Sequence, residues 1–184
     1  MLKDDHRTVE ALFSKFESLG KRAHKGRADL VERMIDALSV HAAIEEQVFY
    51  PEVRRAVPAA EDEVLEGLEE HHVVKWTLSE LDGMAPQDER FTPKVTVLME
   101  SVRHHVREEE KEMFPQVRKA LPAAQLRDLG DRLRAAKQTA PTRPHPRSPD
   151  TPPGNVVAAA LTAPLDAAAN VAQAAAERVR DLVT

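Results

Sequence analysis

The sequence predicts an all-α protein built on an antiparallel up-down four-helix bundle. Four segments repeat apolar residues at the spacing of an amphipathic helix, and none shows the alternation of a half-buried strand. The composition agrees, because Ala, Leu, Val, Glu and Arg dominate while aromatic residues make up 4% of the chain. Short connections between the segments place consecutive helices side by side and antiparallel.

The first two expected helices form one hairpin. The stripe of the first helix ends at Gly20 and contains Leu2, Val9, Leu12, Phe13, Phe16 and Leu19. The stripe of the second helix contains Leu30, Met34, Ala37, Leu38, His41, Glu45 and Val48. Pro51 is expected to end or kink the second helix, because proline has no N–H donor and its ring clashes with the preceding turn.

The third and fourth expected helices form a second hairpin. The third stripe, closed by Gly83 and Pro86, contains Val64, Leu68, His71, Val74, Leu78 and Leu81. The fourth stripe contains Val95, Leu98, Val102, His105, Glu109 and Met113. Pro115 is expected to end or kink this helix as Pro51 does the second. A short extra helix with Leu126, Leu129 and Leu133 follows.

Three regions are expected along the chain. Residues 1–139 form the bundle and its extra helix, 140–155 a Pro-rich disordered linker, and 156–184 an Ala-rich C-terminal amphipathic helix. The linker contains "TAPTRPHPRSPDTPPGN", which holds many of the thirteen prolines. One face of the last helix could pack on the bundle, bind a protein partner or self-associate. That face contains Val157, Leu161, Leu165, Ala172, Val179 and Leu182.

Charge and composition disfavour several classes of protein. The net charge of -5, without a basic block, argues against binding to nucleic acid. The absence of cysteine excludes disulfides and thiolate metal sites. The N-terminal residues "MLKDDHRTVE" lack an apolar targeting segment, and the charges of the last helix with Asn170 disfavour a membrane span. We therefore expect a cytoplasmic protein without a membrane span.

The two hairpins are copies of one another in sequence. Ten of the twenty positions from His41 match the residues 64 positions later, including His41 with His105 and Glu45 with Glu109. An offset of 65 superposes His6 on His71. The one-residue change falls in a connection between helices, where insertions are tolerated. Each hairpin thus has one His on its first helix and His-x-x-x-Glu on its second.

This repeat predicts a metal site inside the bundle. Residues four apart share one face of a helix, so each His-x-x-x-Glu pair can bind one ion. No Lys or Arg occupies a matching stripe position, and two divalent metal ions would neutralise the buried glutamates. The candidate ligands from all four helices are His6, His41, Glu45, His71, His105 and Glu109.

Neighbouring residues compete with some of these ligands. His72 lies beside His71, and His104 with Glu108 has the spacing of His105 with Glu109; in both cases the repeat favours the residues chosen. His24 and His145 are expected to be solvated, and Glu10, Glu46 and Glu110 to be surface residues and not further ligands. Tyr50 pairs with Phe114 in the repeat and is expected to pack in the core, with a phenol near the site as the second possibility.

The order His, His-x-x-x-Glu, His, His-x-x-x-Glu over roughly residues 1–125 resembles the hemerythrin-like, or HHE cation-binding, family. The continuations "VFYPEVR" and "MFPQVRK" resemble it too. The resemblance implies a non-haem diiron centre with terminal His ligands and bridging Glu45 and Glu109. Oxygen-carrying members have a further His where this chain has Lys75, and they space the last bridging carboxylate as Glu110 rather than Glu109.

The resemblance implies a protein that binds or senses O2, NO, peroxide or iron and could decompose peroxide. Lys75 in place of a ligand favours redox reaction or sensing over oxygen storage. Iron suits the mixed imidazole and carboxylate ligands, and manganese and zinc fit them as well. Two alternatives are a ferritin-like diiron oxidase, whose motif order is reversed, and a metal-free interaction module that acts through its C-terminal helix.

Overall fold

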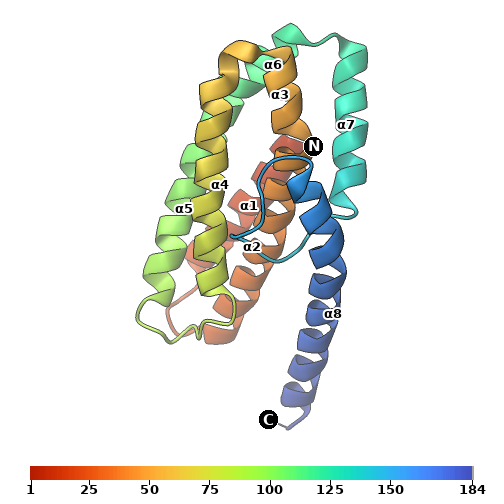
Figure 1. The fold of residues 1–184 in the computed structure, drawn as a ribbon. Coiled ribbons are helices and arrows are strands. Elements are labelled where there is room, and N and C mark those ends of the chain that lie inside the picture. Colours follow the sequence, from red (N-terminus) through yellow and green to blue (C-terminus); the bar gives the residue numbers. More distant parts are fainter. Residues whose placement is uncertain (184) are drawn as a thin grey trace.

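Four long helices run up and down in one bundle in this computed structural model, which describes residues 1–183 apart from the side chains of 173, 174 and 176–183 (Figure 1). The first hairpin consists of α1 (Leu2–Ser18), α2 (His24–Ile44), a π-helical turn η1 (Glu45–Phe49) and α3 (Tyr50–Ala56). The second consists of α4 (Glu61–Leu81), α5 (Phe91–Glu108), a π-helical turn η3 (Glu109–Met113) and α6 (Phe114–Ala120). A 3-10 turn, η2 (Pro58–Ala60), joins the two hairpins. The predicted all-α bundle is confirmed.

A π-helical turn lies just before each of Pro51 and Pro115, where a helix end or kink was expected. The amide of Tyr50 donates to the carbonyl of Glu45, five residues back, and that of Phe114 donates to Glu109 in the same way. This widened turn lies just before each proline, where the regular hydrogen-bond ladder must lose a donor. Both helices then continue, to Ala56 and Ala120.

The apolar core has two parts, with a layer of polar side chains between them. One part includes Val9, Leu38, Val74 and Val102. The other lies toward the opposite end of the bundle and includes Leu2, Ile44, Leu68 and Met113. Each long helix passes from one part to the other near its His or His-x-x-x-Glu residues. The fold therefore surrounds these polar side chains with apolar walls.

The extra helix α7 (Ala123–Lys137) lies against α2 and η1, and it buries Leu129 and Leu133 against the second part of the core. It thereby backs the bundle where the first π-helical turn lies. The sequence predicted this helix from the same leucines.

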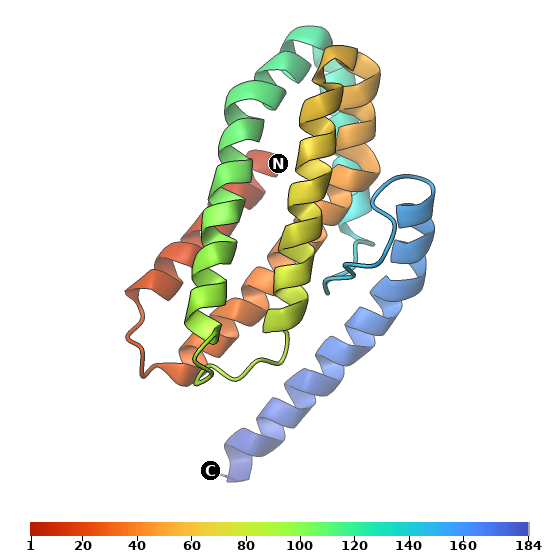
Figure 2. The ribbon, with the colours of Figure 1, turned by 60° about the vertical axis from the view of Figure 1, so that its left-hand side comes forward.

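The segment expected to be a disordered linker is turn-rich and packs on other elements. Arg143 contacts Glu32 at 2.8 Å and Asp82 at 3.2 Å, and the carboxylate of Asp166 accepts from the backbone amides of Thr142 and Arg143. His145, expected to be solvated, lies 3.1 Å from Asp166. The helix that follows is α8 (Gly154–Val183), on the opposite side of the bundle from α5 (Figures 1 and 2).

The outer face of α8 is apolar and exposed where its side chains are described. Val157, Leu161 and Leu165 are each more than half exposed. The side chains of Val179 and Leu182 and the whole of Thr184 lie outside the described residues. By length and composition Gly154–Ala172 could cross a membrane, with a mean hydropathy of 1.2, but one such helix is weak evidence of a span.

Candidate metal centre

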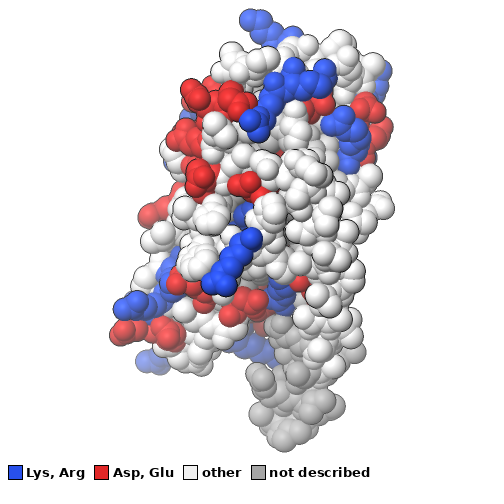
Figure 3. Space-filling model, in the orientation of Figure 1, with Lys and Arg blue, Asp and Glu red and all other residues white. Residues whose placement is uncertain are grey.

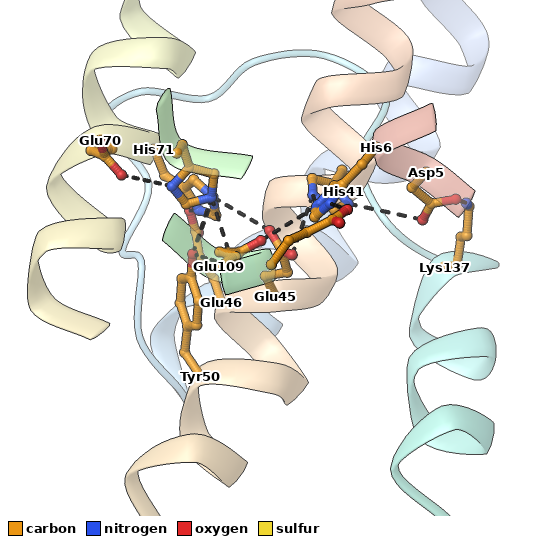
Figure 4. Close-up of polar contacts among 12 residues, drawn as sticks. Asp5, His6, His41, Glu45, Glu46, Tyr50, Glu70, His71, Glu109 and Lys137 are labelled. Atoms are coloured by element: carbon orange, nitrogen blue, oxygen red, sulfur yellow. Dashed lines mark hydrogen bonds and ion pairs between the residues drawn. The ribbon is translucent and has the colours of Figure 1, made fainter. Parts of the chain in front are cut away.

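The six predicted ligands converge in the polar layer between the two parts of the core. All are buried, and Glu45 and Glu109 are 0% and 2% exposed. Glu45 and Glu109 lie between His71 on one side and His6 with His41 on the other (Figure 4). The amphipathic stripes position them, because each His replaces an apolar residue on the inner face of its helix.

One half of the centre contains the two histidines of the first hairpin. Their Nε2 atoms face one another at 3.1 Å. Glu45 Oε1 lies 3.2 Å from His41 Nε2, and Glu109 Oε2 lies 3.3 Å from His6 Nε2. Two imidazole nitrogens and two carboxylate oxygens thus point at one position.

The other half repeats this arrangement with the second hairpin. The Nε2 atoms of His71 and His105 are 3.2 Å apart. Glu45 Oε2 lies 3.4 Å from His71 Nε2, and Glu109 Oε1 lies 3.7 Å from His105 Nε2. Each carboxylate therefore directs one oxygen to each histidine pair, which is the arrangement that two bridged ions require.

The donor atoms are better placed to bind metal ions than to form hydrogen bonds with one another. Both oxygens of Glu45 and Oε2 of Glu109 are buried without a hydrogen-bond partner, which is costly unless a cation binds them. Burial and the charge of Glu109 raise the pKa of Glu45 well above its usual value. Burial raises the pKa of Glu109 too, but the nearby imidazole of His6 and the charges of His105 and His41 outweigh it and lower that pKa to about 2. Two divalent ions between these carboxylates would favour the charged form of both.

Burial also keeps two of the imidazoles neutral, as metal ligation requires. It lowers the pKa of His41, and it lowers the pKa of His71 well below the usual value, assisted by the charge of His105. Nε2 of each histidine faces the centre, which leaves Nδ1 to interact with the layer behind it.

Carboxylates from the π-helical turns hold two of the histidines from behind. Nδ1 of His71 donates to Glu46 at 3.1 Å, and Nδ1 of His6 donates to Glu110 at 2.9 Å. Glu46 is buried, so the expectation that it is a surface residue is wrong, whereas the side chain of Glu110 is 31% exposed. Such contacts orient a ligating imidazole and raise its basicity.

The residues that precede the first histidine of each hairpin lie behind the other two histidines, and one of them makes a hydrogen bond. Nδ1 of His105 donates to Glu70 at 2.7 Å, and Asp5 lies 3.9 Å from Nδ1 of His41. Asp5 and Glu70 are equivalent in the repeat, as are Glu46 and Glu110. Sequence reasoning missed these roles, although the repeat retains an acidic residue at all four positions.

Lysines pair with three of these four supporting carboxylates. Lys75 is buried and lies 2.8 Å from Glu46, which corrects the expectation that no Lys or Arg occupies a stripe position. The other two pairs are Lys137 with Asp5 at 2.6 Å and Lys3 with Glu110 at 3.1 Å. The lysines neutralise the layer behind the histidines, not Glu45 and Glu109.

Tyr50 makes the two halves of the centre different. Its hydroxyl donates to Glu109 Oε1 at 3.2 Å and lies 3.4 Å from His71 Nε2 and 3.5 Å from His105 Nε2. Packing was the favoured role for Tyr50, with a phenol near the site as the second possibility, and the phenol points into the centre (Figure 4). The equivalent Phe114 stacks on His6 with ring centroids 5.8 Å apart and has no donor.

The competing histidines point outward. His72 is exposed, whereas His71 is buried, and the side chain of His104 is 53% exposed against 7% for His105. Glu10 is exposed as expected, and His24 is half-buried at the start of α2. The structure therefore brings His71 and His105 to the centre in the register that the repeat predicted.

Comparison with known proteins identifies the family. Residues 1–117 match the family described as "Hemerythrin HHE cation binding domain". An uncharacterized hemerythrin-like protein of Schizosaccharomyces pombe is 28% identical over 163 residues, which cover 88% of this chain and 79% of that protein. A DNA nickase of Nostoc is 27% identical over 137 residues, which cover 74% of this chain but 38% of the nickase.

A solved structure has the same fold. The crystal structure of a hemerythrin HHE cation binding domain-containing protein from Mycobacterium kansasii is similar at a TM-score of 0.63. The matched region covers 74% of this chain and 82% of the Mycobacterium kansasii chain, with 23% sequence identity.

Proposed function

Because this chain belongs to the hemerythrin HHE cation-binding family, we propose that it is a non-haem diiron protein that binds O2, NO or peroxide. The observation that carries the proposal is the placement of Glu45 and Glu109, each with one oxygen toward each histidine pair. His6 and His41 would hold one ion, His71 and His105 the other, and the two glutamates would bridge them. The choice of iron rests on the family and on the mixed imidazole and carboxylate donors.

The chain's own residues prepare the centre for this task. Glu46, Glu70 and Glu110 hold three of the imidazoles with Nε2 inward, so little reorganisation is needed when ions bind. The apolar walls exclude bulk water and strengthen the electrostatic contacts inside. When bound, a pair of irons supplies one-electron redox chemistry and coordination positions for a small ligand.

Two features support a small ligand. The hydroxyl of Tyr50 is a hydrogen-bond donor beside the histidines of the second hairpin, where a bound oxygen or nitrogen atom could accept from it. A surface groove of about 390 Å³ between α1 and α5 reaches His6 and Glu110 and has Val9, Phe13 and Val102 along it. The groove offers an approach to the half of the centre that has Phe114 instead of Tyr50.

Peroxide decomposition is part of the proposal, because Lys75 stands where the oxygen carriers of the family have a further ligand. Lys75 is tied to Glu46 at 2.8 Å, so its ammonium is held away from the role of a ligand. One coordination position fewer from the protein would leave more room for peroxide. The nickase activity of the Nostoc relative is not carried over, because this chain covers 38% of that protein.

Metal content and visible absorption of protein from iron-replete cells test the proposal. We expect two irons per chain and absorption bands that are lost in His71→Ala. The matched control is His72→Ala, which changes an exposed histidine one residue away and should keep both. Oxygen release on addition of peroxide tests the decomposition. Iron-free protein that is fully folded would disprove the diiron centre.

A further inference from the structure

A second His-x-x-x-Glu pair on α5 faces outward and lies within reach of a glutamate from α4. His104 Nε2 is 3.2 Å from Glu108 Oε1 and 3.8 Å from Glu70 Oε1. Ligand atoms of these three residues lie within 4.8 Å of one another. We propose that Glu70, His104 and Glu108 form an outer site for a divalent cation, from which ions enter the buried centre.

The outer site lies beside a cavity that leads inward. The cavity has a volume of about 60 Å³, and its lining includes Glu70 and Glu108 together with His105 and Glu109 of the proposed centre. Glu109 is 2% exposed, and its Oε1 lies 3.7 Å from Nε2 of His105, in the half of the centre that the cavity reaches. A cation at the outer site is therefore one cavity away from a buried carboxylate of the proposed centre.

The charge around this cavity favours cations. Glu63, Glu66 and Glu112 also line it, and within the part of the chain that is described no Lys or Arg pairs with Glu66, Glu108 or Glu112. Acidic side chains run along the edge of the molecule formed by α4 and α5 (Figure 3). A cleft of one charge sign concentrates ions of the opposite sign and speeds their entry.

Glu70 connects the outer site to the buried one. Its Oε2 accepts from His105 Nδ1 at 2.7 Å, while its Oε1 faces His104. Glu46 and Glu110 hydrogen-bond to two of the other histidines and Asp5 lies near the third, and each of these carboxylates pairs with a lysine, whereas Glu70 has no lysine partner among the described residues. A carboxylate without a lysine partner is available to a metal ion.

The donor set suits a weakly held divalent ion. One imidazole and two carboxylates are ligands that Fe²⁺ and Mn²⁺ accept, and His104 is exposed enough for water to complete the coordination. Weak binding is what an entry site needs, because the ion must leave it again. The inward route rests on the proposed diiron centre, but the outer site itself does not.

Titration with Mn²⁺ tests the outer site. The iron-loaded full chain is titrated with Mn²⁺, and free Mn²⁺ is measured by electron paramagnetic resonance. We expect one weakly bound Mn²⁺ per chain and an affinity at least about tenfold lower in His104→Ala. That change removes a ligand on the surface without removing an acidic charge. Glu112→Gln is the matched control, because it removes one charge of the cavity and keeps all three ligands. No bound Mn²⁺, or equal affinity in His104→Ala and wild type, would overturn the proposal.

The rate of iron loading tests the route. Anaerobic addition of Fe²⁺ to metal-free chain should fill the centre several-fold more slowly in His104→Ala, with the same final iron content and absorption. Equal rates would refute the entry role. If wild type takes up no buried iron, the proposed function fails, and the difference in Mn²⁺ binding between that metal-free wild type and His104→Ala still decides the outer site.

Discussion

The hydroxyl of Tyr50 donates a hydrogen bond to Oε1 of Glu109 over 3.2 Å. Tyr50 directly follows the first π-helical turn, η1, and Glu109 is the first residue of the second, η3. This hydrogen bond occurs once, because the repeat has Phe114 at the position equivalent to Tyr50. Two nearly symmetric hairpins therefore build an asymmetric centre.

Tyr50→Phe should keep both irons and change their absorption. The variant removes a single buried donor, so we expect the free energy of unfolding of the metal-free protein to fall by about 1 kcal/mol. Iron content, visible spectrum and chemical denaturation measure the three quantities. A spectrum identical to wild type would show that the phenol does not act on the metals.

Glu45→Gln should stabilise the metal-free protein while it weakens iron binding. Burial and Glu109 raise the pKa of Glu45 well above 4.5 in the folded chain. The unfolded chain releases that proton near the usual pKa, so the stability of metal-free wild type should fall as the pH rises above about 4.5. The uncharged amide should raise the free energy of unfolding at pH 7 by about 1–3 kcal/mol and flatten this slope. Denaturation at several pH values, with and without iron, measures both effects. A steeper dependence of stability on pH in the variant would contradict the raised pKa of Glu45.

Lys75→Met should destabilise the protein through Glu46. It leaves a buried carboxylate without its cation, which costs about 3 kcal/mol. Burial raises the pKa of Glu46 and Lys75 lowers it, so the variant should raise it further. The double variant Lys75→Met with Glu46→Gln should recover much of the stability, but it should bind iron about 10- to 100-fold more weakly, because an uncharged amide accepts from His71 less strongly than a carboxylate. If the losses of stability from the two single changes simply add in the double variant, the pairing of Lys75 with Glu46 is contradicted.

Gly67→Ala should disturb the centre by steric contact. A Cβ at Gly67 would lie 2.9 Å from the Tyr50 hydroxyl, so the phenol that donates to Glu109 must shift. We expect an altered iron spectrum and no gain in stability. Gly130→Ala in α7 is the matched control, since its nearest neighbour is the end of Arg134 at 3.6 Å. It should gain about 0.8–1 kcal/mol of helix propensity and leave the spectrum unchanged.

Truncation after Thr139 should leave two irons bound. The proposed ligands lie before this point, although Arg143 contacts Glu32 and Asp82 and α8 touches η1. Loss of these contacts should lower the thermal midpoint by several degrees. Metal analysis and a thermal melt of the shortened chain measure both, and loss of iron would contradict the predicted boundary of the bundle at residue 139.

Much of the fold and the candidate centre could be predicted from local patterns. Apolar spacing predicted the long helices, because an amphipathic helix must bury one face. The repeat selected His71 over His72 and His105 over His104, since only one register places each residue on that face. The structure buries the first of each pair and exposes the second. Metal ligation itself stays a prediction.

The sequence by itself determined the all-α bundle, the duplication and the six inward-facing candidate ligands, because these depend on spacing along a single helix. Only the tertiary structure decided the role of residues that act across helices. Glu46 reaches His71 on another helix, and Tyr50 reaches Glu109. Spacing along one helix cannot show which neighbouring helix lies behind a histidine, or how far a π-helical turn rotates the next side chain. Those contacts depend on how the helices pack, and packing exists only in three dimensions.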